Sequence, residues 1–272
     1  MTGVSPRRID CHVHAFPDRL ALAVREALNR QGRLRSSPLL PDVAQSVLDQ
    51  GFDGAWILPY AHRAGVSASV NEWSAEQVGH YPWLVAGATF HPDDENFTAV
   101  VEAALVRLGL RVVKLHCSVG NFSVADPRLE PLWHEAERLG VPVVVHAGRG
   151  PGQTDAAELD GLIPVLKSHN DLKFVLAHSG HPGCGRALEL MDDYPNLYGD
   201  LTPVWENTVA LTAEHLERFS GRFLFGSDAP NNPVLAREQA SRFDALGLNA
   251  DTLSMLMGGT AERLLRAASL AG

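Results

Sequence analysis

The sequence predicts a (β/α)8 (TIM) barrel formed as a single domain. Short, nearly continuous apolar segments alternate with amphipathic segments of helical period, which is typical of a parallel sheet covered by helices. Eight such strand segments occur, and histidines or aspartates stand at the ends of most of them. A chain of 272 residues that is 45% hydrophobic can bury one large core. We therefore treat residues 1–272 as one domain.

The first predicted strand lies in the stretch from Arg8 to Phe16. Successive side chains of a strand point to opposite faces, so Asp10, His12 and His14 are expected on one face. Two helical segments follow, at 17–32 and 41–51, each with proline near its start and glycine at its end. This helical insertion after strand one is longer than a usual connection and could cover an active site.

The remaining elements follow in regular alternation. Strands two to eight are expected at 53–61, 83–92, 111–118, 140–148, 172–180, 196–203 and 222–230. Helices are expected at 94–108, 129–139, 155–168, 186–193 and 206–219, with two more at the end of the chain. Eight units favour a closed barrel. A doubly wound sheet normally has fewer strands and a glycine-rich first turn, whereas this first turn reads HAFPDR.

Composition narrows the class of partner. The formal charge is −9, from 23 Lys and Arg against 32 Asp and Glu, and the sequence contains no basic run. A nucleic-acid partner is therefore not expected, and a small molecule is. No apolar run approaches a membrane span of roughly 18 residues, and the first residues lack the apolar stretch of a signal peptide. With three cysteines that lack paired spacing, we expect a cytoplasmic protein with no membrane partner. A homo-oligomer remains an open alternative.

Polar residues are expected at the carboxyl ends of the predicted strands. In a barrel this rim is where catalytic sites form. The residues in question are His14, His91, His116, His146, His178 and Asp228. A single buried histidine is more often a hydrogen-bonded core residue than a ligand, but several that converge on one mouth favour metal binding. His12, His14, His146 and Asp228 are the candidate ligands.

Several motifs carry a resemblance over essentially the whole chain. They are IDCHVH, KLH, PVVVHAG, FVLAHSG and LFGSDAP at strands one, four, five, six and eight, and GGTAERLLR near the end. This set resembles the metal-dependent amidohydrolase superfamily, and within it the amidohydrolase-2 branch. The resemblance implies a distorted (β/α)8 barrel in which His12, His14, His146 and Asp228 match metal positions. His178 matches a ligand or a catalytic histidine. The family contains hydrolases of amides, esters and lactones, and also nonoxidative decarboxylases and hydratases.

Lys114 has three alternative roles. In two-metal members of the superfamily, a carboxylated lysine on strand four bridges the ions. A free ammonium beside a divalent cation would be repelled, so Lys114 is carboxylated, lies away from the metal, or binds a substrate carboxylate. The closer resemblance to the one-metal branch favours a substrate or structural contact. His116, His91 and Arg149 are further candidates to line the substrate site, although the loop that carries Arg149 is equally consistent with a flexible turn.

The expected reaction is hydrolysis of a small molecule at an amide, ester or lactone carbonyl. One divalent metal is expected, zinc in view of the nitrogen and oxygen ligands, with manganese, iron or cobalt as alternatives. Such a metal lowers the pKa of bound water toward about 7. Asp228 would then take the proton of the water and pass it to the leaving group, and His178 would orient the water or stabilise the oxyanion. Asp10 would hydrogen-bond to the imidazole of a ligand and fix its orientation without contacting the metal. A second metal is expected only if Lys114 is carboxylated.

Three other functions compete with hydrolysis. The first is a decarboxylase or hydratase that uses the same metal site. The second is a noncatalytic binding protein that keeps the metal, against which the intact set of site residues argues. The third is the related deoxyribonuclease group, which carries a glutamate where Lys114 stands and does not suit an acidic chain.

Overall fold

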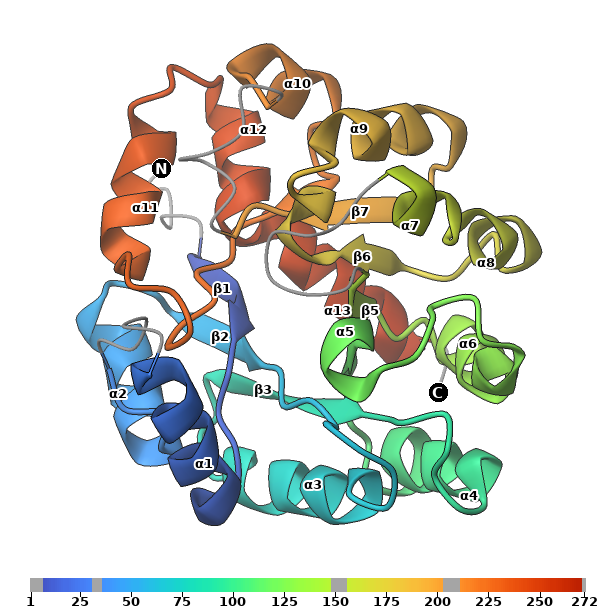
Figure 1. Cartoon of the computed structure of the whole chain (residues 1–272). Coiled ribbons are helices and arrows are strands. Elements are labelled where there is room, and N and C mark those ends of the chain that lie inside the picture. Colours follow the sequence, from blue (N-terminus) through green and yellow to red (C-terminus); the bar gives the residue numbers. More distant parts are fainter. Residues whose placement is uncertain (1–6, 31–35, 148–155, 203–210, 271–272) are drawn as a thin grey trace.

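Eight parallel strands form the centre of the molecule (Figure 1). The computed structural model describes residues 7–30, 36–147, 156–202 and 211–270. The strands pair in sequence order from β1 to β8. Their bounds are Ile9–Val13 (β1), Gly54–Ile57 (β2), Leu84–Thr89 (β3), Val112–His116 (β4), Val143–His146 (β5), Phe174–Leu176 (β6), Leu197–Asp200 (β7) and Phe223–Leu224 (β8). The predicted (β/α)8 barrel is confirmed.

Hydrogen bonds between the first and last strands join the two edges of the sheet. The backbone N–H of Cys11 donates to the carbonyl of Phe225 at 2.9 Å, and that of Asp228 donates to the carbonyl of His12 at 2.8 Å. β8 contains only two residues, and the register between β1 and β2 shifts. The barrel is therefore distorted at this seam, and the seam is where residues from both ends of the chain meet.

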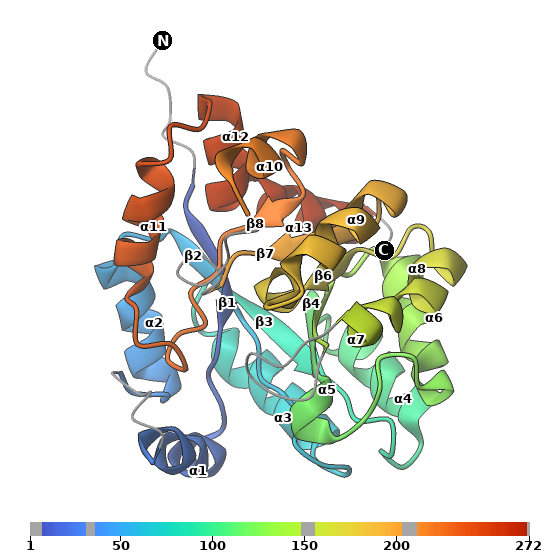
Figure 2. The same ribbon diagram turned by 45° about the horizontal axis from the view of Figure 1, so that its top comes forward.

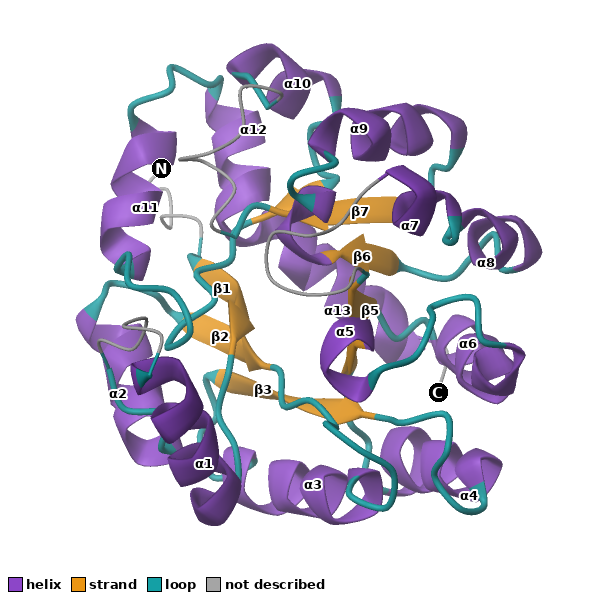
Figure 3. Ribbon diagram, in the orientation of Figure 1, coloured by secondary structure: helices purple, strands orange, loops and turns teal. Residues whose placement is uncertain are grey.

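Helices surround the strands on the outside (Figure 3). They are α1 (Asp18–Asn29), α2 (Leu40–Asp49), α3 (Ser67–Trp73), α4 (Phe97–Glu102), α5 (Cys117–Gly120), α6 (Glu130–Leu139), α7 (Ala156–Asp160), α8 (Ile163–Ser168), α9 (Cys184–Asp193), α10 (Ala213–Arg218), α11 (Ala236–Asp244), α12 (Ala250–Ser254) and α13 (Thr260–Leu270). π-Helical segments at Ser74–Val78, Ala103–Arg107 and Met255–Gly259 continue α3, α4 and α12. α1 and α2 confirm the predicted insertion after strand one, and Figure 2 shows α1 beyond the end of β1.

Some helix boundaries differ from the prediction. The helix expected at 155–168 is two helices, α7 and α8, because Pro164 in the first turn of α8 has no N–H to continue the preceding helix. The helix expected from 206 begins at Ala213, where the Thr212 side chain caps it, and residues 206–210 lie outside the described residues. Three helices rather than two end the chain. No helix in the described ranges has the length and apolar character to cross a membrane.

The barrel interior has an apolar floor. Its buried members come from seven strands and α13: Ile9, Cys11, Trp56, Leu58, Val112, Val144, Val175, Ala177, Tyr198, Leu224, Ala261 and Leu264. Two residues further along β4, β5 and β7 the same strand face carries Lys114, His146 and Asp200 instead. A polar layer therefore lies above the apolar floor, at the carboxyl ends of the strands.

Candidate metal centre

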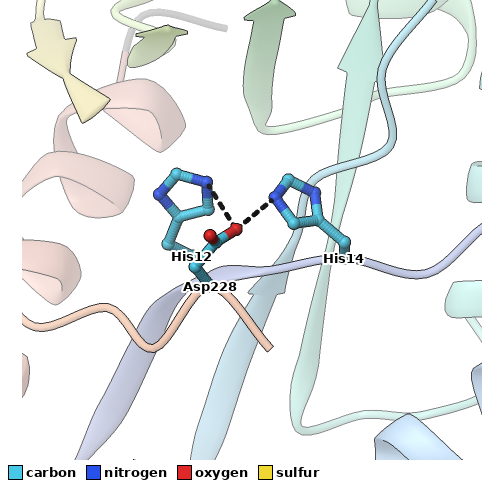
Figure 4. A group of neighbouring side chains, drawn as sticks. All are labelled: His12, His14 and Asp228. Atoms are coloured by element: carbon cyan, nitrogen blue, oxygen red, sulfur yellow. Dashed lines mark ion pairs between the residues drawn. The ribbon is translucent and has the colours of Figure 1, made fainter. Parts of the chain in front are cut away.

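Two histidines of the β1 segment and an aspartate that follows β8 converge at the seam (Figure 4). The candidate ligand atoms of His12, His14 and Asp228 all lie within 4.8 Å of one another. Oδ1 of Asp228 is 3.0 Å from Nε2 of His14 and 3.9 Å from Nε2 of His12. Nitrogen and oxygen ligands of a tetrahedral zinc lie roughly 3.4 Å apart. The three side chains are therefore spaced to share one cation.

Hydrogen bonds set which ring nitrogen of each histidine faces the centre. In three histidines Nδ1 contacts an oxygen acceptor: Leu58 O at 2.6 Å from His14, Asp200 Oδ2 at 2.8 Å from His12, and Thr202 O at 2.5 Å from His178. These oxygens only accept, so Nδ1 carries the proton. Nε2 is left as the lone-pair donor, which is the arrangement of a metal-ligating histidine.

His146 faces the same layer. Its ring stacks on His116, with centroids 4.1 Å apart, and meets His178 edge to face at 4.9 Å. Neither ring nitrogen of His146 has a hydrogen-bond partner among the described residues, although the side chain is buried. Burial lowers the pKa of both His146 and His116, so the rings are neutral, the form that binds metal. Because an unpartnered buried nitrogen is costly, a cation fits this position.

Asp228 is held as a carboxylate at the mouth. Burial alone would raise the pKa of Asp228, but its position beside the imidazoles of His14, His178 and His12 lowers that pKa overall. Its backbone is in the left-handed region, with φ of 59°, and its side chain is 13% exposed whereas that of His12 is fully buried. Asp228 is thus the member of the group that a substrate can reach.

A β-bulge between Asp10 and Val13 overturns one prediction. Asp10 lies with Val13 on the outer side of the barrel, where both line a small cavity beside α2. Its Oδ1 accepts the backbone N–H groups of His12 at 3.2 Å and Ser227 at 2.9 Å, and burial raises its pKa to about 7. Asp10 therefore does not share a face with His12 and His14, and it holds backbone rather than an imidazole ring.

The carboxylate that binds Nδ1 of His12, the ring nitrogen turned away from the centre, is Asp200, which was not among the predicted site residues. It ends β7, is 1% exposed, and binds Nδ1 of His12. The criterion applied to the other strands, a polar residue at the carboxyl end, would have found it. Tyr60 was also missed, and its ring lies 5.3 Å from that of His14 and 5.0 Å from that of His116.

Lys114 lies inside the group. Its side chain is fully buried, and Nζ is 3.0 Å from Nε2 of His12. Burial lowers the pKa of Lys114 to about 8, and the carboxylates of Asp200 and Asp228 oppose that shift. A position away from the candidate ligands is therefore excluded. A substrate contact and carboxylation remain the two roles for this residue.

His91, another predicted site residue, stands apart from this group. Both ring nitrogens of His91 contact backbone groups: Nε2 lies 2.9 Å from Gly120 O, and Nδ1 accepts the N–H of Asp93 at 3.2 Å. These contacts make His91 an anchor for the loops after β3 and β4. Arg149 lies outside the described residues.

Comparison with family models identifies the family of this chain. A family model described as amidohydrolase, that of the amidohydrolase-2 family, matches residues 9–267. The chain therefore belongs to the amidohydrolase-2 family, a family of metal-dependent enzymes. The resemblance drawn from the motifs is confirmed.

Solved structures share the fold. An uncharacterised TIM-barrel protein from Bordetella bronchiseptica is 22% identical, with a TM-score of 0.74 over 97% of this chain and 99% of the other. The 5-carboxyvanillate decarboxylase of Sphingomonas paucimobilis is 16% identical, with a TM-score of 0.73 over 96% and 99%. A dihydroxybenzoic acid decarboxylase from Polaromonas, solved with manganese and 2-nitroresorcinol, is 16% identical, with a TM-score of 0.74 over 96% and 97%. Comparison with curated protein sequences finds no significant match.

Proposed function

We propose that this protein is a hydrolase of small molecules with an amide, ester or lactone carbonyl, and that it uses one divalent metal, zinc. His12, His14, His146 and Asp228 would hold the metal. The observation that carries the proposal is the group of Nε2 of His12, Nε2 of His14 and Oδ1 of Asp228, with the unpartnered nitrogens of His146 nearby. When bound, the metal would activate a water molecule and polarise the carbonyl.

The residues of the chain supply the proton transfers. Asp228 is a carboxylate at the exposed edge of the group, so it can accept the proton of the water and return it to the leaving group. His178 presents Nε2 to the same centre, because its Nδ1 is held by the carbonyl of Thr202. His178 would orient the water or stabilise the oxyanion that forms at the carbonyl.

Lys114 and His116 complete the proposed substrate site. The ammonium of Lys114 is the major form at neutral pH, since its pKa of about 8 lies above 7. It would bind an anionic group of the substrate, such as a carboxylate. His116 and Tyr60 supply a ring-lined wall beside His14.

A nonoxidative decarboxylase is the second candidate. A buried ammonium next to the proposed metal position suits a substrate carboxylate, and two solved structures with this fold are decarboxylases of aromatic acids. In that reaction the metal and Lys114 would hold the acid while a proton donor, Asp228 or His178, protonates the carbon that loses carbon dioxide.

One assay separates the two candidates. Zinc-loaded and manganese-loaded protein is incubated with esters, lactones and amides on one side and with aromatic and unsaturated carboxylic acids on the other. Formation of the carboxylic acid from the ester, lactone or amide, measured by chromatography, supports hydrolysis. Release of carbon dioxide with uptake of a proton supports decarboxylation and overturns the main proposal. Failure of both metal forms on the whole panel would favour a noncatalytic binding protein.

A further inference from the structure

We propose that Asp200 is a positioning residue that fixes His12 in the Nδ1–H form and so directs Nε2 of His12 to the metal. This inference rests on the proposed function, because it assumes that His12 is a ligand. The carboxylate ends β7, the strand next to β8 in the sheet order, and is 1% exposed.

The two oxygens of Asp200 have different partners. Oδ2 accepts from Nδ1 of His12 at 2.8 Å. Oδ1 accepts three hydrogen bonds: from the backbone N–H of His178 at 2.9 Å, the Oγ1 hydroxyl of Thr202 at 2.7 Å and the N–H of Thr202 at 3.3 Å. One buried carboxylate therefore joins a ring on β1 to the backbone after β6.

A second contact of His12 agrees with this assignment. The ammonium of Lys114 has only donors, and its Nζ lies 3.0 Å from Nε2 of His12. A lone pair on Nε2 of His12 can accept from Nζ of Lys114, which agrees with a ring proton on Nδ1, where Asp200 accepts it. The same carboxylate acts on His178, whose backbone lies in the left-handed region with φ of 56° and donates to Oδ1. Asp200 thereby orients two histidines of the site.

Among these three histidines, only His12 has its Nδ1 held by a side chain, so a substitution can change which of its ring nitrogens carries the proton. The Nδ1 atoms of His14 and His178 are held by backbone carbonyls, which keep their acceptor character in any variant. In Asp200→Asn, three donors face the position of Oδ1, so the amide oxygen will take that position. The amide NH2 group then faces Nδ1 of His12 and donates to it. The ring proton moves to Nε2, which can no longer bind a metal.

Asp10→Asn is the matched control. Asp10 is another buried aspartate near the seam, and its Oδ1 accepts two backbone N–H groups. An amide oxygen can accept the same two bonds, and the NH2 group faces no imidazole in the described structure. If the change from a buried carboxylate to an amide lowers zinc affinity by itself, both variants will bind zinc more weakly. If zinc affinity falls because the tautomer of His12 changes, only Asp200→Asn will bind zinc more weakly.

The test is zinc affinity, measured by competition with a chromophoric chelator on the metal-free full-length chain. We expect Asp200→Asn to weaken zinc binding 10- to 100-fold, the usual effect of losing a partner behind a ligand, and Asp10→Asn to stay within about threefold. Zinc binding by Asp200→Asn within threefold of wild type would overturn the proposal.

The protonation site of the His12 ring can also be measured on the wild-type chain, which tests the role of Asp200 even if Asp200→Asn does not fold. In metal-free protein labelled with 15N-histidine, the His12 ring, assigned by its loss in His12→Ala, should be protonated at Nδ1. A ring protonated at Nε2 would refute the role of Asp200. This spectrum needs no metal and no substrate, so it tests the role of Asp200 independently of the proposed function. If the proposed function is wrong, the wild-type protein will bind no zinc.

Discussion

Nε2 of His14 lies 3.0 Å from Oδ1 of Asp228, although the two residues are 214 positions apart in sequence (228 − 14 = 214). The seam between β1 and β8 creates this contact, because backbone hydrogen bonds there set the two ends of the barrel sheet side by side. The candidate metal centre therefore depends on barrel closure. A chain that keeps its helices but opens this seam cannot form it.

The first prediction concerns His12 in β1 and His14 directly after it. His12→Ala combined with His14→Ala should abolish tight metal binding, because the pair supplies half of the four proposed protein ligands. Elemental analysis after dialysis measures the metal content, and circular dichroism checks that the helices remain. Full metal content in the folded double variant would show that the centre lies elsewhere.

The second prediction concerns the number of metal ions. We expect one tightly held ion per chain, since Lys114 must be carboxylated before it can bridge two. Metal counting on protein purified without chelator decides this. Two tight ions, with activity that rises on addition of bicarbonate, would instead assign Lys114 as a carboxylated bridge between them.

The third prediction concerns Gly226, two residues before Asp228. A Cβ atom at this position would lie 2.4 Å from Oγ1 of Thr202 and 2.7 Å from Cβ of His12, so Gly226→Ala fits only if both contacts are relieved by a shift of the surrounding atoms. We expect a loss of about 1–3 kcal/mol in the free energy of unfolding, together with weaker metal binding.

Gly185→Ala is the control for that substitution. Gly185 lies in α9, where a Cβ atom meets nothing within 4 Å. Alanine there should stabilise the chain by up to about 1 kcal/mol, because it favours the helix. Chemical denaturation measures both variants. Equal stability of the two would show that the space beside His12 is not tightly packed.

The fourth prediction concerns proton transfer by Asp228. An amide has nearly the shape of the carboxylate but is a poor base, so Asp228→Asn should retain substrate binding and lose roughly 10² to 10⁴ in turnover. Steady-state kinetics on a substrate found in the panel, with metal content measured in parallel, provides the test. A fully metallated Asn variant with near wild-type turnover would move the proton transfer to His178.

The repeated pattern of the sequence predicted the barrel well, because eight apolar strands and their helices follow local periodicity. It also predicted that His12, His14 and Asp228 meet, since the strand ends of a barrel share one rim. The sequence pattern could not predict the features that depend on irregular backbone. The bulge after Asp10 changes which face this residue occupies, and simple alternation along a strand contains no signal for it.

Other differences come from contacts between distant segments. His91 ends its strand as the site histidines do, yet its ring nitrogens bind backbone groups of neighbouring loops. Asp200 followed the rim pattern, but only the folded barrel shows that its carboxylate meets His12. Lys114 could be placed on the inner face of strand four, whereas its distance to His12 required the structure.

The most direct test of the metal centre is a crystal structure of the zinc-loaded protein with anomalous data collected on both sides of the zinc edge. We expect one strong anomalous peak within bonding distance, roughly 2.0–2.2 Å, of Nε2 of His12, Nε2 of His14 and Oδ1 of Asp228, with His146 turned toward it. A strong peak at another place in the fold, with these side chains bonded only to one another, would contradict the account.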